Sequence, residues 1–141
     1  MVEPVGVQNV PPVKVWEALR RDPQAQLVDV RTEPEWNFVG LPDLAAVGKQ
    51  AVLIPWQVYP TMERNEKFVE HLKEAGFTPE HHIYFLCRSG QRSLAAAMAA
   101  RAAGFPHAYN IADGFEGGVD AQGHRGVAAG WKAEALPWRQ R

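Results

Sequence analysis

The sequence contains a single cysteine among its 141 residues. One cysteine cannot form an internal disulfide, so the fold does not depend on oxidation, and a free thiol survives best in a reducing compartment. The formal net charge is −1 at pH 7, and neither a basic excess nor a charge run indicates a surface for nucleic acid. No apolar run approaches the roughly 18 residues of a membrane span, and residues 1–4 lack the basic and apolar regions of a secretory signal. These absences predict a cytoplasmic protein that binds neither nucleic acid nor a membrane.

Metal-binding and nucleotide-binding patterns are missing as well. There is no Cys-x-x-Cys pair and no His-Glu-x-x-His motif. His81 and His82 are neighbours, so in an extended segment their side chains point to opposite faces. The glycines after Asp113 do not form a dinucleotide-binding fingerprint, because neither their spacing nor a strand-to-helix context fits. We therefore expect no metal site and no organic cofactor.

What the sequence does have is the composition of one globular domain. Apolar residues make up 46% of the chain and charged residues 22%, which are ordinary values, and a chain of this length buries a sizeable core. Strand-like apolar runs alternate with helical segments, and two of the helices are expected to end at a glycine followed by phenylalanine, at Gly76 and Gly104. This repeated strand–helix–strand pattern predicts an α/β fold.

The elements can be placed from periodicity and punctuation. We expect helices between Pro12 and Asp22, at 65–75 and at 93–103, and strands at 5–10, 26–30, 51–54, 83–86 and 107–111. Val15, Trp16 and Leu19 lie at helical spacing and should pack on the sheet. Residues 41–50 are predicted to form an enlarged loop.

A further helical turn is predicted after Thr32. Glu35 follows three residues later, and this spacing matches a capping box, in which the two side chains satisfy backbone N–H groups at the helix start.

The single cysteine lies between a predicted buried strand and a predicted helix. It follows the apolar run 83–86 and precedes the alanine-rich segment 94–103. In open α/β sheets, ligands bind in the crevice at the carboxyl ends of the strands. We therefore take the whole stretch as the candidate site: Cys87, Arg88, Ser89, Gly90, Gln91, Arg92 and Ser93.

The backbone of this stretch suggests its chemistry. If the loop curls, the N–H groups of residues 88–93 converge into an anion-binding nest, and the dipole of the following helix adds partial positive charge. Arg88 and Arg92 add two full charges unless they point outward, and Gly90 permits a positive φ at the bend. Cys87 is then expected to be a nucleophilic thiolate at neutral pH, in a cradle for anions. The alternative is a buried structural cysteine, which is a common state of free cysteine.

These seven residues resemble the active-site loop of the rhodanese family of sulfurtransferases. Residues 27–36 resemble the strand and turn found early in rhodanese domains, residues 110–115 the stretch after the last strand, and residues 130–137 the closing segment. The likeness runs from about residue 10 to 137. It departs from the family at Gly40-Leu41-Pro42-Asp43, where rhodanese domains commonly carry Gly-His-Ile-Pro-Gly-Ala.

The resemblance implies a single rhodanese-like domain over residues 1–141, with a central, mainly parallel five-stranded sheet and helices on both faces. It implies transfer of a sulfane sulfur from thiosulfate or a related small anionic donor to a thiol, cyanide or protein acceptor, through a persulfide on Cys87. The rhodanese fold also resembles that of the cell-cycle dual-specificity phosphatases. In the active-site loop of those enzymes, however, five residues separate the cysteine from the arginine. Here four residues separate Cys87 from Arg92, and by resemblance the shorter loop goes with sulfur transfer.

Other functions stay open at the level of sequence. The domain is either an enzyme that uses thiosulfate, a carrier that passes persulfide between proteins, or a docking module that uses the fold alone. An intact Cys87 beside two arginines argues against the pure docking module, because such a module needs no nucleophile.

Two charged residues, Asp29 and Arg31, lie at the end of the predicted strand 26–30. An unpaired buried carboxylate is costly, so Asp29 should pair with Arg31 or with backbone N–H groups. We expect this pair to support the site structurally, with direct participation in sulfur transfer as the alternative.

An apolar cluster has two interpretations. Trp56, Tyr59, Pro60 and Met62 either pack on the sheet, which we favour, or line an entrance to the cysteine.

The glycine-rich segment 113–130 has neither helical nor strand period and is predicted to be a loop. It is either a solvated surface loop, which we favour, or a lid that brings Glu116, His124 or Arg125 near the substrate.

Overall fold

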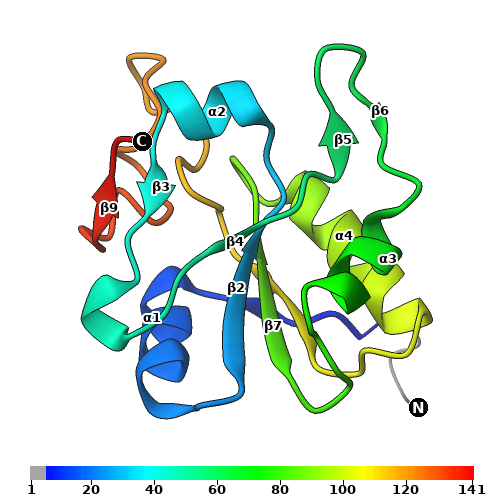
Figure 1. Cartoon of the computed structure of the whole chain (residues 1–141). Helices are drawn as coiled ribbons and strands as arrows, with labels where there is room; N and C mark the ends of the chain where they lie inside the picture. Colours follow the sequence, from blue (N-terminus) through cyan, green and yellow to red (C-terminus); the bar gives the residue numbers. More distant parts are fainter. Residues whose placement is uncertain (1–5) are drawn as a thin grey trace.

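The structure is a computed structural model that describes residues 6–141 (Figure 1). Residues 1–5 lie outside the described part of the chain. The predicted absence of a secretory signal at residues 1–4 and the predicted start of the edge strand at Val5 therefore lie outside the described residues.

A five-stranded parallel sheet forms the centre of the molecule and confirms the predicted α/β fold. Its strands run in the order β1-β8-β7-β2-β4, and every pairing within it is parallel. Their bounds are Asn9–Val10 for β1, Ala25–Asp29 for β2, Val52–Leu53 for β4, His82–Leu86 for β7 and Ala108–Ile111 for β8.

Helices cover both faces of this sheet, also as predicted. They are α1 (Pro12–Arg21), α2 (Glu33–Phe38), α3 (Phe68–Glu74) and α4 (Gln91–Ala102), with a short 3₁₀ helix, η1, at Ala45–Val47. Successive side chains of a strand point to opposite faces. Phe85 of β7 therefore packs in a core with residues of α3 and α4, whereas Tyr84 and Leu86 pack in a second core with residues of α1. Burial on both faces explains the nearly continuous apolar sequence of this strand.

The ends of α3 and α4 confirm the predicted glycine stops. Gly76 and Gly104 have φ of +95° and +105°, in the left-handed region that glycine adopts most easily. The following N–H groups, of Phe77 and Phe105, donate to the carbonyls of Leu72 and Ala100. Both phenylalanines are buried against the last helical turn, as expected for this type of helix end.

The helix starts differ from the prediction. Helix α3 begins at Phe68 and not at residue 65, because Asn65 forms a turn in which its side-chain oxygen accepts the N–H of Lys67. Helix α4 begins at Gln91, two residues earlier than expected, directly after Gly90 with φ of +112°. The second half of the cysteine stretch is therefore the first turn of α4.

Two small antiparallel ribbons flank the main sheet. Leu41–Pro42 (β3) pairs with Trp138–Arg139 (β9), and Gln57–Val58 (β5) pairs with Glu63–Arg64 (β6). The prediction of an enlarged loop over residues 41–50 is therefore wrong in detail, since this segment contains the short strand β3 and the 3₁₀ helix η1. In the part of the chain that the structure describes, no helix has the length and apolar character to cross a membrane.

Candidate active site

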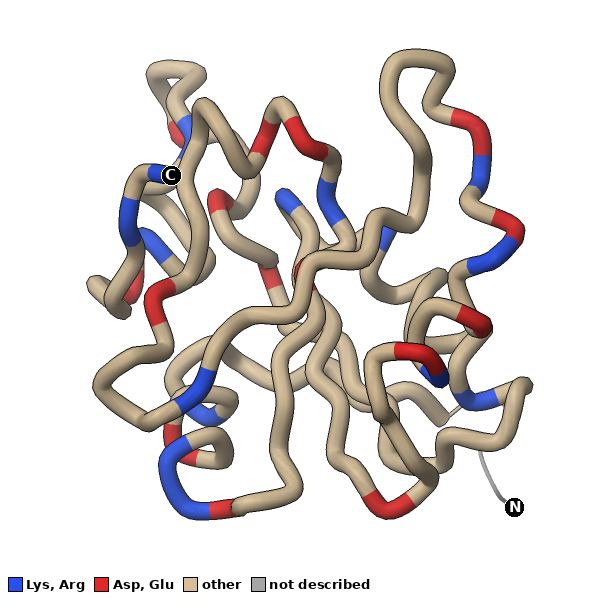
Figure 2. The backbone as a smooth tube through the Cα atoms, in the orientation of Figure 1, with Lys and Arg blue, Asp and Glu red and all other residues tan. Residues whose placement is uncertain are grey.

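The cysteine stretch lies at the carboxyl end of β7, between α2 and the β5–β6 hairpin (Figure 1). Basic and acidic positions are interspersed along the backbone (Figure 2), and the formal net charge of the chain is only −1. Attraction for an anion must therefore come from nearby groups, as the sequence suggested.

Cys87 is buried beneath its own loop, with 1% of its surface exposed. Its Sγ lies 3.1 Å from the Gly90 backbone nitrogen, whose N–H donates to it, and 3.2 Å from the hydroxyl oxygen of Ser93. Both donors come from the turn into α4. Donors of this kind stabilise negative charge on sulfur, so the arrangement is chemically suited to a nucleophilic thiolate.

Ser93 is in turn connected to the last strand of the sheet. Its hydroxyl oxygen also lies 2.5 Å from Oδ1 of Asn110, a second acceptor within its reach. The amide nitrogen of Asn110 donates to the carbonyl of Gly90 and to Oδ1 of Asn9, at 3.2 and 2.8 Å. Asn110 was not among the predicted site residues. The available signal was a polar residue inside a buried strand, which requires partners.

Arg92 forms a bidentate ion pair with Glu35 of α2. Its two terminal nitrogens donate to the two carboxylate oxygens at 2.8 and 2.9 Å. Glu35 Oε1 also accepts the N–H of Thr32, so the predicted capping box is present. Burial would raise the pKa of the Glu35 carboxyl, but the Arg92 and Thr32 contacts outweigh it and hold that pKa at about 2. The positive charge of Arg92 is therefore largely compensated within the protein.

A cleft of about 440 Å³ opens beside the loop. Both loop arginines line it, together with residues of α2 and of the β5–β6 hairpin: Thr32, Pro34, Glu35, Gln57, Tyr59, Met62, Arg88 and Arg92. Arg88 is exposed, and among residues 6–141 its side chain has no hydrogen-bonding or ion-pair partner. It is consequently the loop arginine best placed to meet an incoming anion.

The other members of the cysteine stretch have simpler surroundings. Ser89 is half-buried and Gln91 exposed.

The predicted apolar cluster at residues 56–62 partly packs on the core and partly lines the cleft, so each interpretation holds for some of its residues. Trp56 packs against Phe68, with ring centroids 5.2 Å apart, as the packing interpretation predicted. Tyr59 and Met62 are 59% and 39% exposed and line the cleft, which agrees with the entrance interpretation. Pro60 is exposed on the same hairpin turn.

Asp29 and Arg31 form the expected buried pair. Both side chains are fully inaccessible, and Arg31 Nη2 donates to Asp29 Oδ2 at 2.7 Å. The same nitrogen donates to the carbonyl of Gly40, and the guanidinium carbon lies 4.4 Å from the centre of the Phe115 ring. Through Arg31, this pair connects the end of β2 to Gly40 and Phe115, as expected for residues that support the site structurally.

The start of the glycine-rich segment holds the cysteine loop from behind. The N–H of Phe115 donates to the carbonyl of Cys87, and those of Glu116 and Gly117 donate to the carbonyl of Arg88. No residue of 113–130 lines the cleft in the described structure, and residues 121–125 are exposed. The surface-loop interpretation therefore fits the outer part of the segment, whereas residues 115–117 belong to the site.

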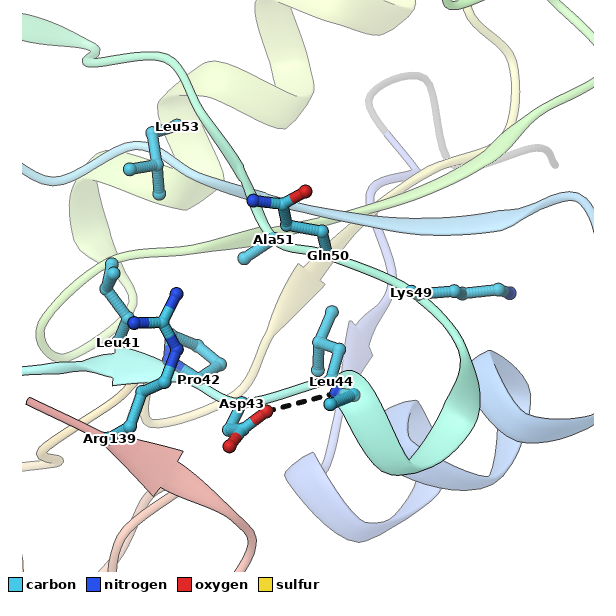
Figure 3. Close-up of a pocket in the computed structure, with 10 residues that line it drawn as sticks. Leu41, Pro42, Asp43, Leu44, Lys49, Gln50, Ala51, Leu53 and Arg139 are labelled. Carbon is cyan, nitrogen blue, oxygen red and sulfur yellow. Dashed lines mark hydrogen bonds between the residues drawn. The ribbon is translucent and has the colours of Figure 1, made fainter. Parts of the chain in front are cut away.

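A second pocket, of about 270 Å³, lies between β3, η1, β4 and β9 (Figure 3). Two of its polar side chains have partners of their own. Asp43 accepts the N–H of Ala45, and the Lys49 side chain points out of the pocket to donate to the carbonyls of Asp22 and Ala25. The pocket shares no lining residue with the cleft beside Cys87. Within residues 6–141, no group of three or more His, Cys, Asp and Glu side chains is arranged to hold a metal ion.

Comparisons with known proteins connect this geometry to named relatives. The family model described as "STR4 middle domain" matches residues 10–141. The uncharacterized protein RC0915 of Rickettsia conorii is 37% identical over 96% of this chain and 99% of its own length. The rhodanese-like domain-containing protein 4, chloroplastic, of Arabidopsis thaliana is 31% identical over 85% of this chain and 23% of its own length. The crystal structure of Rv0390 from M. tuberculosis is 45% identical, with a TM-score of 0.86, over 96% of this chain and 98% of that one.

Proposed function

This chain belongs to the rhodanese-like domain family, and we propose that it is a sulfurtransferase that carries a sulfane sulfur as a persulfide on Cys87. The observation that supports this most is the position of the Cys87 sulfur. It accepts hydrogen bonds at the start of α4 and its loop borders a cleft lined by two arginines. Such a site suits a thiolate nucleophile and an anionic reaction partner.

In the first half-reaction, the Cys87 thiolate attacks the outer sulfur of a donor such as thiosulfate. The sulfur–sulfur bond of the donor breaks, and sulfite leaves with the electron pair, so that Cys87 becomes a persulfide. Arg88 attracts the donor and its departing anion, because its charge is exposed on the cleft. Arg92 holds α2 beside the loop through Glu35.

In the second half-reaction, a nucleophilic acceptor attacks the outer sulfur of the persulfide. The acceptor is a thiol or a protein cysteine, with cyanide as its replacement in an assay. The bond between the two sulfurs breaks, and the Cys87 thiolate returns to the hydrogen bonds from Gly90 and Ser93. These residues require no metal or organic cofactor for either step.

The rim of the cleft supports a protein as a sulfur partner. Val58, Tyr59 and Met62 are 45%, 59% and 39% exposed, although they are large apolar side chains. A small anion gains little from such a surface, whereas a polypeptide buries it on binding. We therefore keep a protein-to-protein persulfide carrier as the second candidate function.

Phosphate transfer is less well supported by this geometry. The loop has four residues between Cys87 and Arg92, and the Arg92 guanidinium is already paired with Glu35. Neither feature leaves the loop free to surround a phosphate group.

Thiocyanate formation from thiosulfate and cyanide tests the enzyme proposal. The wild-type protein is expected to turn over, and Cys87→Ser is expected to be inactive while still folded, as judged by circular dichroism. Turnover by Cys87→Ser would overturn the assignment of the nucleophile. Persulfide on Cys87 that forms from a protein donor but never from thiosulfate would favour the carrier.

A further inference from the structure

The side chain of Asn110 contacts the cysteine loop from behind, and its orientation is determined by its partners. Its Nδ2 faces the carbonyl oxygen of Gly90, at 3.2 Å, and Oδ1 of Asn9, at 2.8 Å. A backbone carbonyl accepts but never donates, so the amide nitrogen must be the atom that faces Gly90. The amide oxygen therefore faces Ser93. Since Asn110 is 4% exposed, water hardly competes for these bonds.

This orientation leaves Ser93 with one proton and two acceptors. Its hydroxyl oxygen is 2.5 Å from Oδ1 of Asn110 and 3.2 Å from Sγ of Cys87. A serine hydroxyl has a single hydrogen, so Ser93 donates to one of these atoms at a time. Asn110 and Cys87 consequently compete for the same hydrogen bond.

We propose that Asn110 is a positioning residue that controls the reactivity of Cys87 through the direction of the Ser93 hydroxyl. In the thiolate, Sγ carries the negative charge and is the stronger acceptor, so Ser93 donates to it. In the thiol and in the persulfide, Sγ is uncharged and Ser93 turns to Asn110. The O–H bond of Ser93 stays intact, and only its direction changes. Asn110 thereby favours the uncharged states of the sulfur over the thiolate.

The charged groups around the sulfur are held by other contacts. Arg92 of α4 interacts electrostatically with Cys87 and is paired with Glu35 of α2. At the end of β2, Asp29 is paired with Arg31. Within residues 6–141, none of these groups is hydrogen-bonded to Asn110 or Ser93. The same holds for the two charged residues of the adjoining loops, Arg88 and Asp113.

The pH profile of Cys87 alkylation by iodoacetamide tests this role. Asn110→Leu removes the competing acceptor, so the midpoint of the profile should move to lower pH by about one unit, the scale of one hydrogen bond to a charged group. Asn110→Asp offers a stronger acceptor and a negative charge, so the midpoint should move to higher pH. A residue that only supports the loop would move both profiles in the same direction.

A double-mutant cycle with Ser93→Ala shows whether Asn110 acts through Ser93. In the Ser93→Ala background, Asn110→Leu should change the alkylation rate less than twofold at every pH, whereas in the wild-type background the rate below the midpoint should rise by up to about tenfold. The control is Asn9→Ala, which leaves the bonds of Asn110 to Gly90 and Ser93 in place and should not move the profile.

Equal shifts in both backgrounds, or a shift of Asn110→Leu to higher pH, would overturn the proposal. If Asn110→Leu does not fold, Asn110→Ala replaces it, since it also lacks the amide. The inference depends on the proposed function only in taking Cys87 as the reactive group. Alkylation uses no sulfur donor, so the two proposals can fail separately. If the alkylation profiles shift as predicted but no persulfide forms, only the proposed function is contradicted. If persulfide forms but the profiles do not shift as predicted, only this inference is contradicted.

Discussion

Arg88 and Arg92 differ in whether their positive charges are free to bind an anion. Arg92 is paired with Glu35, whereas Arg88 is exposed on the cleft. We expect Arg88→Ala to raise the KM for thiosulfate by about tenfold, because one charge-assisted contact to the anion is lost, with a smaller change in kcat. Steady-state kinetics measure this. The matched control is Arg20→Ala, which removes an exposed arginine paired with Glu17 on α1 and should leave the KM unchanged. An unchanged KM in Arg88→Ala would contradict the role of Arg88.

Gly114 is a second residue with a defined steric role. A Cβ at this position would lie 2.5 Å from the carbonyl oxygen of Cys87. Gly48 has a similar φ, +70° against +63°, but a Cβ there would meet no atom within 4 Å. We expect Gly48→Ala to lower the free energy of unfolding by about 1 kcal/mol through backbone strain, and Gly114→Ala to lower it by about 3 kcal/mol or more. Denaturant unfolding compares the two, and equal losses would show that the contact with the cysteine loop carries no cost.

At this scale, local patterns in the sequence predicted some contacts and missed others. Asp29 was predicted to pair with Arg31 or with backbone N–H groups, because a buried carboxylate requires a partner, and it does both. The pairing of Arg92 with Glu35 joins residues 57 positions apart, and only the fold brings them together. Arg92 was expected to add a full charge to the anion cradle unless it pointed outward, and its pairing with Glu35 was not predicted.

Helix α2 contributes an acid-sensitive contact to the site. The pKa of the Glu35 carboxyl is lowered from its usual 4.5 to about 2. A carboxyl whose pKa is lower in the folded state stabilises the fold above its unfolded pKa, and this contribution is lost as the pH falls through the folded value. We therefore expect the stability from Glu35 to be complete above pH 4.5 and to be lost progressively toward pH 2.

Glu35→Gln tests this contribution. It should lower the free energy of unfolding at pH 7 by about 1–2 kcal/mol, because Arg92 loses a charged partner, and should weaken the pH dependence between 4.5 and 2. Urea unfolding over this pH range is the measurement. Glu17→Gln, in an exposed ion pair of α1, should change little. The same pH dependence in Glu35→Gln and in the wild-type protein would contradict the account.

The elements themselves were largely predictable, but their ends and the small ribbons were not. The buried strands and the glycine-terminated helices have strong periodic signals, as in β7 and α4. The ribbons β3–β9 and β5–β6 have strands of two residues each, which is too short for a periodic pattern. The pairing of Leu41–Pro42 with Trp138–Arg139 also depends on how the chain end folds back.

Across the whole molecule, the closing segment of the chain completes the core on the face covered by α1. Trp131 is fully buried, donates to the carbonyl of Pro137, and packs edge-on against Trp16 with centroids 6.0 Å apart. We expect Trp131→Ala to lower the free energy of unfolding by about 3–5 kcal/mol. Trp138→Ala, at a position that is 41% exposed, is the matched control and should cost much less. Thermal and denaturant unfolding measure both, and equal costs would argue against this part of the core.

The sequence predicted the architecture of the fold better than it predicted the shape of the cleft beside Cys87. Alternating strands and helices determine a parallel sheet with a site at its carboxyl edge. The cleft depends on the hairpin that carries Tyr59 and Met62 and on its distance from α2. The division of segment 113–130 into a part that holds the cysteine loop and an exposed part also required the tertiary structure, because both parts are equally rich in glycine.

The most direct test of sulfur transfer through Cys87 is the mass of the intact protein after incubation with thiosulfate. We predict a gain of one sulfur atom, about 32 Da, that reductant reverses and that is absent in Cys87→Ser. A protein that gains no mass while its thiol alkylates readily at neutral pH would contradict thiosulfate as donor. A gain that persists in Cys87→Ser would contradict Cys87 as the sulfur carrier.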